Sequence, residues 1–420
     1  MPDIWLPYGK TEVCVRIPTE NLRDVIKAAE VKHAEDPRSE IENSIRNPLK
    51  TENLAEIAKQ GGNAALALNI SDPSIANIII SLILEELTHA GLKPEDLTII
   101  FAHDPFSQRM NEMKRQLKDE MSQLGVKAVF HNYLSDCVQI GELSNGTKIY
   151  VNRAFAESEI KIVASTVELN PYTFCSGCGY AVLLGLSNMD TISQILSPIL
   201  NFDDPINAFK DINIHKAMTE TLHLAEVKFT INLVCNPSGR IIKSFAGDVD
   251  NSRDEAAKLV DSIYKVQVER RVPIVFASPG GSPFDNNLFE SYKCVENSLR
   301  IVRRNGVFVL VAECFGGFGN RKFQEALLKF KENLDFLRRI LRRNFSIGGF
   351  MAYRFLRAIK KADICMVSAM PNYYISEALG LKAFRTANEA LNYALERAGK
   401  RAGVSAILHG NLTTPIIGGT

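Results

Sequence analysis

The amino-acid sequence predicts an α/β protein: two α/β domains with mostly parallel sheets and a cleft between them. Short β-rich runs alternate with amphipathic helices along the chain, and this alternation is typical of right-handed crossovers between parallel strands. A length of 420 residues suits about two or three domains. A charged helix predicted at residues 252–270 is the expected boundary, which gives domains at residues 1–265 and 266–420.

The first domain is predicted from a series of strands and helices. Residues 64–70 (AALALNI) read as a buried strand, and Ser74 can cap the next helix, which stops at Gly91. A charged helix is predicted over residues 107–124. The other predicted strands are residues 97–102, 127–130 and 161–167, and a hairpin is predicted from residues 229–235 and 240–245.

The second domain repeats the α/β pattern from about residue 270 onwards. Thr386 and Glu389 have the spacing of a capping box for its last helix. Its predicted strands are residues 272–277, 306–314, 362–368 and 404–409. Ligands of such sheets bind beyond the carboxyl ends of the strands, so the loops there are the first candidates for a site.

Composition and charge disfavour several classes of protein. Lys plus Arg is 49 and Asp plus Glu is 48, a net charge of +1 that does not favour a general nucleic-acid or polybasic membrane binder. No apolar run approaches the roughly 18 residues of a membrane span. Eight scattered cysteines suit a reducing compartment. We therefore expect a cytoplasmic protein with no nucleic-acid and no membrane partner.

The richest of the loops at predicted strand ends is Ser278–Asn287. Gly280 and Gly281 allow a tight turn, and the loop opens a helix whose N-terminal amides favour an anion. Lys293 lies on that helix, eight residues beyond Asp285. The alternative is a plain strand-to-helix turn capped by Asp285. The three other candidate loops are residues 71–74, 103–107 and 168–179.

Three further features each have a functional and a structural interpretation. His103 lies at a strand end beside Asp104, where a general base can lie, although a surface or capping histidine is the alternative. Cys175 and Cys178 form a lone CxxC, for which two packed cysteines are favoured over a metal or redox site, because zinc requires about four ligands. A basic helix face favours a solvated surface over an anion or nucleic-acid patch; it comprises Arg338, Arg339, Arg342 and Arg343.

The segment from Ser278 to Lys293 resembles the nickel-pincer lactate racemase family. The residues that fit the family pattern are Gly280, Gly281, Pro283, Asp285, Asn287, Phe289 and Lys293. The resemblance covers nearly the whole chain and includes residues 6–8, 214–218 and 244–248. It implies two α/β domains with the active site between them, and racemisation or epimerisation of 2-hydroxy acids. In that family a lysine-tethered nickel-pincer cofactor accepts a hydride while paired histidines move a proton.

The sequence departs from the family where this chemistry occurs. Tyr180 stands at the position of the tethering lysine, and Leu196 at that of the nickel-ligating histidine. One catalytic histidine is replaced by Asn170, and the other falls near Pro105, two residues from His103. Leucine cannot bind nickel and tyrosine offers no amine. We therefore expect no metal and no cofactor of the nickel-pincer type.

These observations give two main hypotheses. The first is an isomerase for a 2-hydroxy acid or sugar acid, with His103, Asp72, Asp104 and Lys293 as catalytic residues. The expected substrate-binding residues are Gly280, Gly281, Asp285, Asn287, Glu290, Asn170 and Tyr180. The second is a non-catalytic carboxylate-binding or regulatory protein on the same scaffold. Either way, the expected partner is a small-molecule carboxylate.

Overall fold

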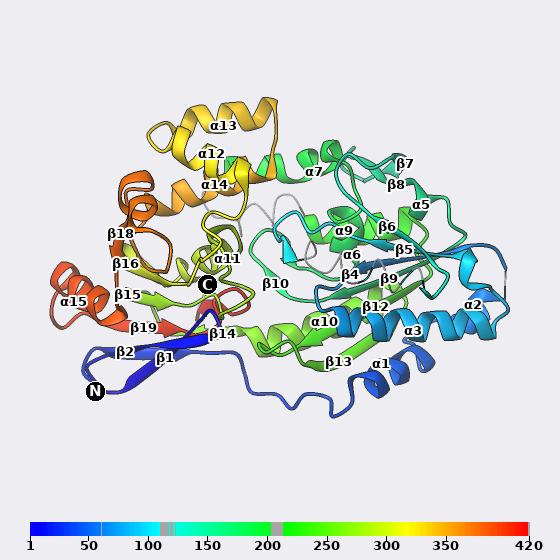
Figure 1. Ribbon diagram of the computed structural model, residues 1–420, viewed down its shortest axis with the longest axis horizontal. Helices are drawn as coiled ribbons and strands as arrows, with labels where there is room; N and C mark the ends of the chain where they lie inside the picture. Colours follow the sequence, from blue (N-terminus) through cyan, green and yellow to red (C-terminus); the bar gives the residue numbers. More distant parts are fainter. Residues whose placement is uncertain (60, 110–116, 118–120, 122, 203–212, 419–420) are drawn as a thin grey trace. The chain divides into compact units, whose positions relative to one another are not determined.

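The computed structural model describes all residues except 60, 110–116, 118–120, 122, 203–212 and 419–420. The chain is an α/β protein of two compact units (Figure 1): unit 1 is Met1–Glu30 with Ser262–Thr420, and unit 2 is Val31–Asp261. This division differs from domains at 1–265 and 266–420, because β3 (Leu22–Ile26) pairs with β19 (Val404–Ile407) and ties the first residues to the C-terminal half. The helix expected over residues 107–124 lies mostly outside the described residues.

Unit 2 is built on a six-stranded sheet with the order β13-β12-β9-β4-β5-β6. All neighbours are parallel except the hairpin of β12 and β13, which confirms the predicted hairpin. The strands are β4 (Ala64–Asn69), β5 (Leu97–Phe101), β6 (Lys127–Phe130), β9 (Ile160–Thr166), β12 (Phe229–Cys235) and β13 (Ile241–Gly247). Smaller pairs are β7 (Cys137–Glu142) with β8 (Lys148–Asn152), and β10 (Leu169–Asn170) with β11 (Phe174–Cys175).

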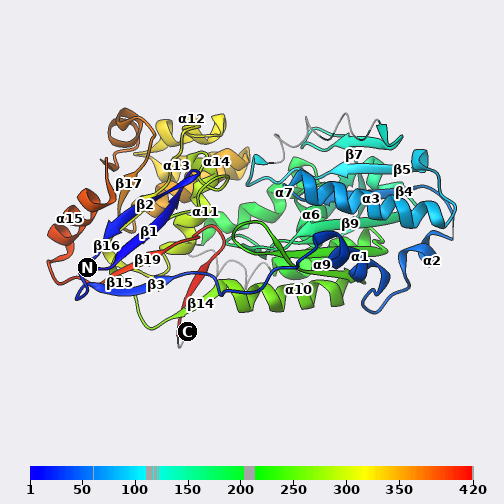
Figure 2. The same ribbon diagram turned by 60° about the horizontal axis from the view of Figure 1, so that its bottom comes forward.

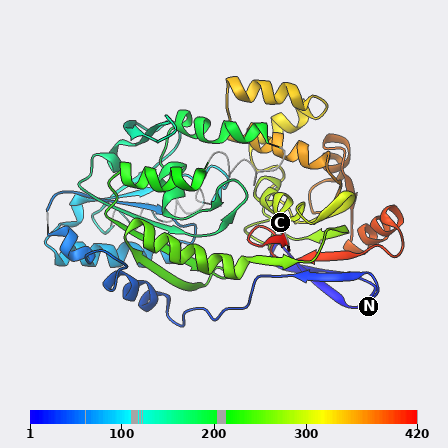
Figure 3. The same cartoon turned by 180° about the vertical axis from the view of Figure 1, so that it is seen from behind.

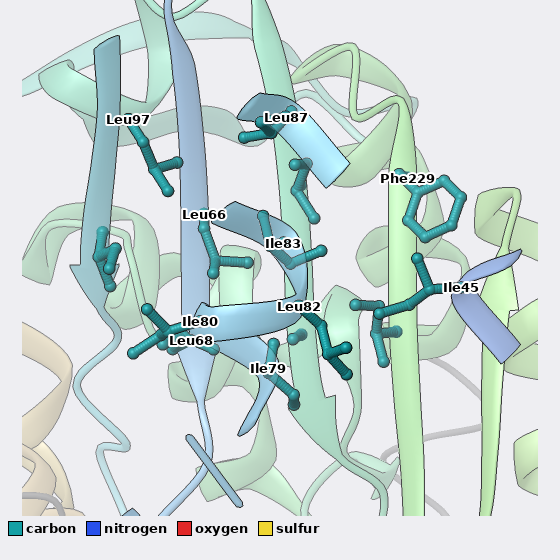
Figure 4. Packing of buried hydrophobic residues seen from close by; sticks show 14 of the residues in the cluster. Ile45, Leu66, Leu68, Ile79, Ile80, Leu82, Ile83, Leu87, Leu97 and Phe229 are labelled. Atoms are coloured by element: carbon teal, nitrogen blue, oxygen red, sulfur yellow. The ribbon is translucent and has the colours of Figure 1, made fainter. Parts of the chain in front are cut away.

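The core of unit 2 lies between this sheet and α3 (Pro73–His89). Ile79 and Ile83 of α3 are fully buried in this core, and Ile83 lies beside Leu66 of β4 (Figure 4), because apolar residues recur at helical spacing on one face. Asp72, and not Ser74, is the N-cap of α3, since Pro73 begins the helix and Asp72 accepts from the backbone N–H groups of the first turn. The other helices are α1 (Pro37–Arg46), α2 (Leu54–Ala58), α5 (Arg153–Ala156), α6 (Cys178–Leu183), α7 (Met189–Leu196), α9 (Ile214–Leu224) and α10 (Val249–Tyr264).

Unit 1 has its own six-stranded sheet, ordered β18-β17-β16-β15-β19-β3 and parallel throughout. Its remaining strands are β15 (Val272–Ala277), β16 (Val302–Val311), β17 (Asp363–Val367) and β18 (Lys382–Phe384). The antiparallel hairpin of β1 (Asp3–Tyr8) and β2 (Thr11–Arg16) lies over this sheet (Figure 2) and contributes Leu6 and Val15 to its core. Short β14 (Lys265–Val268) pairs with β20 (Thr414–Ile417).

The helices of unit 1 follow its strands. They are α11 (Leu288–Ser298), α12 (Arg321–Phe330), α13 (Leu334–Arg343), α14 (Ile347–Ile359) and α15 (Ala387–Ala398), with a π-helix, η3 (Tyr373–Ala378), after β17. Helix α15, coloured red, packs against β2 (Figure 3). Thr386 caps α15 as predicted. The carboxylate of Glu389, however, accepts from the N–H of Arg385 rather than from that of Thr386. Tyr292, Glu296 and Arg354 form a buried hydrogen-bonded group between α11 and α14.

Candidate functional site

Three of the four candidate loops lie at one edge of the unit 2 sheet. They follow β4, β5 and β9, which are adjacent parallel strands, so their carboxyl ends meet. Parallel α/β sheets bind ligands at this edge. The fourth loop, Ser278–Asn287, follows β15 in unit 1 and is described separately.

Tyr180 is anchored at the unit 2 edge by a long-range hydrogen bond. It lies on the short helix α6, is 1% exposed, and donates from its hydroxyl to Oδ1 of Asp104 at 2.6 Å. Asp104 also accepts from the backbone N–H of Phe106 at 2.9 Å. Burial, together with the charge of Asp104, raises the pKa of Tyr180 well above its ordinary value. The phenol therefore stays protonated at neutral pH and acts as a hydrogen-bond donor.

His103 lies one residue before Asp104, at the end of β5. Its imidazole meets the ring of Tyr133 edge-on at 4.6 Å between centroids. Burial, and then the charge of Asp104, raise the pKa of Tyr133. The structure thus brings His103, Asp104, Tyr133 and Tyr180 together at one strand end.

The other predicted residues of unit 2 make local turn contacts. Asp72 is exposed, and its Oδ1 accepts from the N–H groups of Ser74 and Ile75 at 2.9 and 3.3 Å. Asn170 accepts from the N–H of Tyr172 at 2.8 Å. Their predicted chemical roles stay predictions, because these contacts are those of a helix cap and a turn.

Arg109 is a candidate residue that sequence reasoning missed. Its guanidinium lies 3.8 Å from a carboxylate oxygen of Glu168, and both side chains are 20% exposed. Arg109 follows β5 and Glu168 follows β9, which flank β4 in the sheet. In the sequence, Arg109 is a basic residue that closely follows the candidate loop 103–107. That position could have marked it as a candidate beside His103.

The remaining positions of interest in unit 2 are buried. Leu196 on α7 is fully buried. Cys178 directs its thiol to the carbonyls of Val163 and Ile231, and burial raises its pKa to about 12. Cys175 lies with its sulfur 3.9 Å from Nε2 of His215. Within the described ranges, no three His, Cys, Asp or Glu side chains converge as a group that could hold a metal ion.

In unit 1 the glycine loop, Ser278–Asn287, contacts residues that are distant in the sequence. Gly281 has φ +74°, and a Cβ there would lie 2.8 Å from the carbonyl oxygen of Gly9. Asp285 is fully buried, and its Oδ2 accepts from the N–H groups of Gly9 at 2.7 Å and Glu313 at 3.1 Å. Burial raises the pKa of Asp285 despite these bonds. Asp285 therefore links β15, the β1–β2 turn and the end of β16.

The helix after the loop is capped by Asn287, so the alternative of an Asp285 cap is wrong. The Asn287 side chain accepts from the N–H of Glu290 at 2.9 Å. Glu290 is buried, whereas Lys293, one turn further along, is half-buried. Of the residues predicted here, Lys293 is the one that carries a positive charge, which suits an anionic ligand.

His409 was missed as a neighbour of the glycine loop. It follows β19, which is parallel to β15, and a Cβ at Gly280 would lie 3.4 Å from Cδ2 of its ring. Burial lowers the pKa of His409. Its position at the end of the predicted strand 404–409 was the signal that could have marked it.

In the described part of the chain no helix is long and apolar enough to cross a membrane. The two units define a two-sheet α/β protein whose unit 1 carries a glycine-rich loop and a helix lysine at its strand ends. A family model for the lactate racemase N-terminal domain matches residues 8–200, and one for the lactate racemase C-terminal domain matches residues 267–413. The chain therefore belongs to the lactate racemase family.

Similar proteins support this assignment. The chain is 23% identical over 405 residues to a lactate racemase of Thermoanaerobacterium thermosaccharolyticum, with 94% of each chain covered. It is 24% identical over 426 residues to a lactate racemase of Lactiplantibacillus plantarum, covering 98% of this chain and 99% of that one.

Solved structures show the same fold. The lactate racemase apoprotein from T. thermosaccharolyticum matches with a TM-score of 0.87 at 21% identity, over 99% of this chain and 100% of that one. A crystal structure of a Thermotoga maritima protein matches with a TM-score of 0.61 at 14% identity, over 88% of this chain and 99% of that one.

Proposed function

We propose that the chain is an isomerase, of the racemase or epimerase type, for a 2-hydroxy acid or sugar acid. The observation that carries this proposal is the glycine loop of unit 1 with Lys293 on the helix that it opens. Lys293 is the proposed partner of the substrate carboxylate, since an ammonium and the first turn of a helix both favour an anion. The names of the relatives support racemisation of a hydroxy acid as the reaction class.

The proposed proton-moving groups lie in unit 2. His103 is the first candidate, because an imidazole at a strand end can accept and return a proton near neutral pH. Asp72 is the second: both of its cap bonds use Oδ1, which leaves Oδ2 for a proton. The Tyr180 hydroxyl donates to Asp104, and we propose that its oxygen accepts a hydrogen bond from a hydroxyl of the substrate or from a neighbouring water.

We further propose that this chain does not use a tethered nickel-pincer cofactor. Tyr180 and Leu196 support this, because neither an amine for a tether nor an imidazole for nickel is present at these positions. The phenol hydroxyl of Tyr180 also donates a 2.6 Å hydrogen bond to Asp104. No step of the proposed reaction is therefore assigned to such a group.

The proposal is tested by turnover of enantiopure 2-hydroxy acids and sugar acids in D2O, followed by chiral analysis. We expect stereochemical inversion or deuterium at C2 with at least one substrate, and its loss in Lys293→Ala. Lys322→Ala, an exposed lysine on α12, is the matched control and keeps wild-type turnover. Full activity of Lys293→Ala would overturn the assignment of this site.

The cofactor proposal has its own measurement. Protein purified from its native host is weighed intact under denaturing conditions, and nickel is quantified in the same sample. We expect the unmodified mass without stoichiometric nickel. A covalent adduct with about one nickel per chain would restore the tethered mechanism and would show that another residue is the tether.

A non-catalytic carboxylate-binding protein is the second candidate function. The Tyr180–Asp104 bond favours it, because a buried phenol paired with a carboxylate closes a position where the family carries cofactor chemistry. This alternative predicts that a hydroxy acid raises the melting temperature without being converted. Any inversion or exchange at C2 would exclude it.

A further inference from the structure

A pocket of about 470 Å³ lies in unit 1 between the turn that joins α12 to α13 and the π-helix η3. Its volume falls within the roughly 300–1,000 Å³ of small-molecule sites. Its lining includes Lys329, Lys331, Glu332, Tyr373, Tyr374 and Glu377. Within the described chain, none of the lining residues belongs to the glycine loop or to the edge of the unit 2 sheet.

Two tyrosines that line the pocket are exposed to solvent. Tyr373 is 68% exposed and Tyr374 is 37% exposed, and their ring centroids lie 5.6 Å apart. The ring of Phe318 meets that of Tyr374 edge-on, with the two ring centroids 5.6 Å apart. Both tyrosines lie on a π-helix, an element that is rare and frequent at functional sites. A flat aromatic ligand would cover the exposed ring of Tyr373 by stacking.

The charged groups of the pocket have no ionic partners. In the described chain, Lys329, Lys331, Glu332 and Glu377 form no ion pair with one another or with other residues. Lys331 is half-buried, and its Nζ lies 2.7 Å from where a Cβ of Gly380 would be, so the missing side chain there makes room for the ammonium. Helix α13 also begins at this pocket, and its N-terminal end adds a positive potential.

We propose that this pocket binds a nucleoside monophosphate. The base stacks on Tyr373, the phosphate pairs with Lys329 and Lys331, and the N–H groups of the base or sugar hydroxyls donate to Glu332 and Glu377. Inorganic phosphate would leave the tyrosine rings uncovered, and an uncharged aromatic would leave the lysines unpaired. A nucleoside monophosphate carries both features in one molecule, and its binding is independent of the reaction proposed above.

Calorimetric titration of the full chain with adenosine monophosphate tests the proposal. We expect saturable binding, with adenosine and inorganic phosphate each at least tenfold weaker. Tyr373→Ala and Lys331→Ala should each weaken binding at least tenfold. The matched controls are Phe315→Ala, which removes an equally exposed ring, and Lys322→Ala; both lie outside the pocket lining and should bind within twofold of wild type.

Three outcomes would overturn the proposal. They are the absence of saturable binding to the wild-type chain, wild-type affinity in both pocket variants, and equal affinity for adenosine and its monophosphate. Tyr373 is exposed and Lys331 is half-buried, and unchanged circular dichroism will show that the variants are folded. The methyl resonance of Ala378, which lines the pocket, should shift on titration; shifts confined to other parts of the chain would also contradict the assignment.

Discussion

The two regions that carry the predicted site residues are held in place in different ways. In the glycine loop of unit 1, Asp285 accepts hydrogen bonds from Gly9, 276 residues away, and from Glu313, 28 residues away. At the unit 2 edge, Asp72 and Asn170 accept from N–H groups two or three residues further along. The glycine loop is thus a junction of the fold, whereas Asp72 and Asn170 lie in local turns.

This difference helps to distinguish residues that the fold requires from residues that ligand binding requires. Gly281 and Asp285 are required for the packing of the glycine loop against Gly9, whatever the loop binds. A turn such as that of Asn170 can accept another side chain at a small cost to the fold.

The largest expected effect is at the junction. Gly281→Ala should destabilise unit 1 by about 3 kcal/mol or more, because a residue at φ +74° costs about 1–2 kcal/mol and its Cβ would meet the carbonyl of Gly9. Gly239→Ala is the control: its φ is +81°, with no atom within 4 Å of the added Cβ, and it should cost only about 1 kcal/mol. Urea unfolding measures both, and equal losses would show that the loop is not a junction.

The next effect tests a long-range side-chain hydrogen bond at the unit 2 edge. Tyr180→Phe removes the donor to Asp104 and should cost about 1.5–3 kcal/mol, the range for a hydrogen bond to a charged group. Asn170→Ala breaks a local turn and should cost about 1 kcal/mol or less. If the Asn170 variant unfolds as easily as the Tyr180 variant, the contrast between local and long-range support is wrong.

The predictable parts of the fold are those with a local pattern. Residues 64–70 and 272–277 were predicted as strands because buried parallel strands are continuous apolar runs, and both are confirmed in β4 and β15. The helix cap was assigned to Ser74 instead of Asp72, because both types cap helices and Pro73 alone decides where the helix begins.

The contacts across long sequence separations could not be predicted. Nothing periodic in Leu22–Ile26 shows that it pairs with Val404–Ile407, so the sequence grouped the first residues with residues up to 265, whereas the structure groups them with Ser262–Thr420. The same limit applies to the bond between Asp285 and Gly9 and to the pair of Arg109 with Glu168. Residue types indicated which loops to examine, whereas the partners within them are set by tertiary packing.

The smallest expected effect concerns the pH dependence of stability beside the glycine loop. Burial lowers the pKa of His409 below its ordinary value of 6.5, so the unfolded chain binds this proton more readily than the folded chain. Stability from His409 is therefore present above pH 6.5 and is lost as the pH falls through 6.5 towards the lower folded pKa. His409→Gln should unfold at more similar urea concentrations at pH 7.5 and 5.5 than the wild type does. His89→Gln, at an exposed position on α3, should keep the wild-type difference. An unchanged difference in the His409 variant would mean that its ring is hydrated, and that the junction of unit 1 is looser than the bonds of Asp285 indicate.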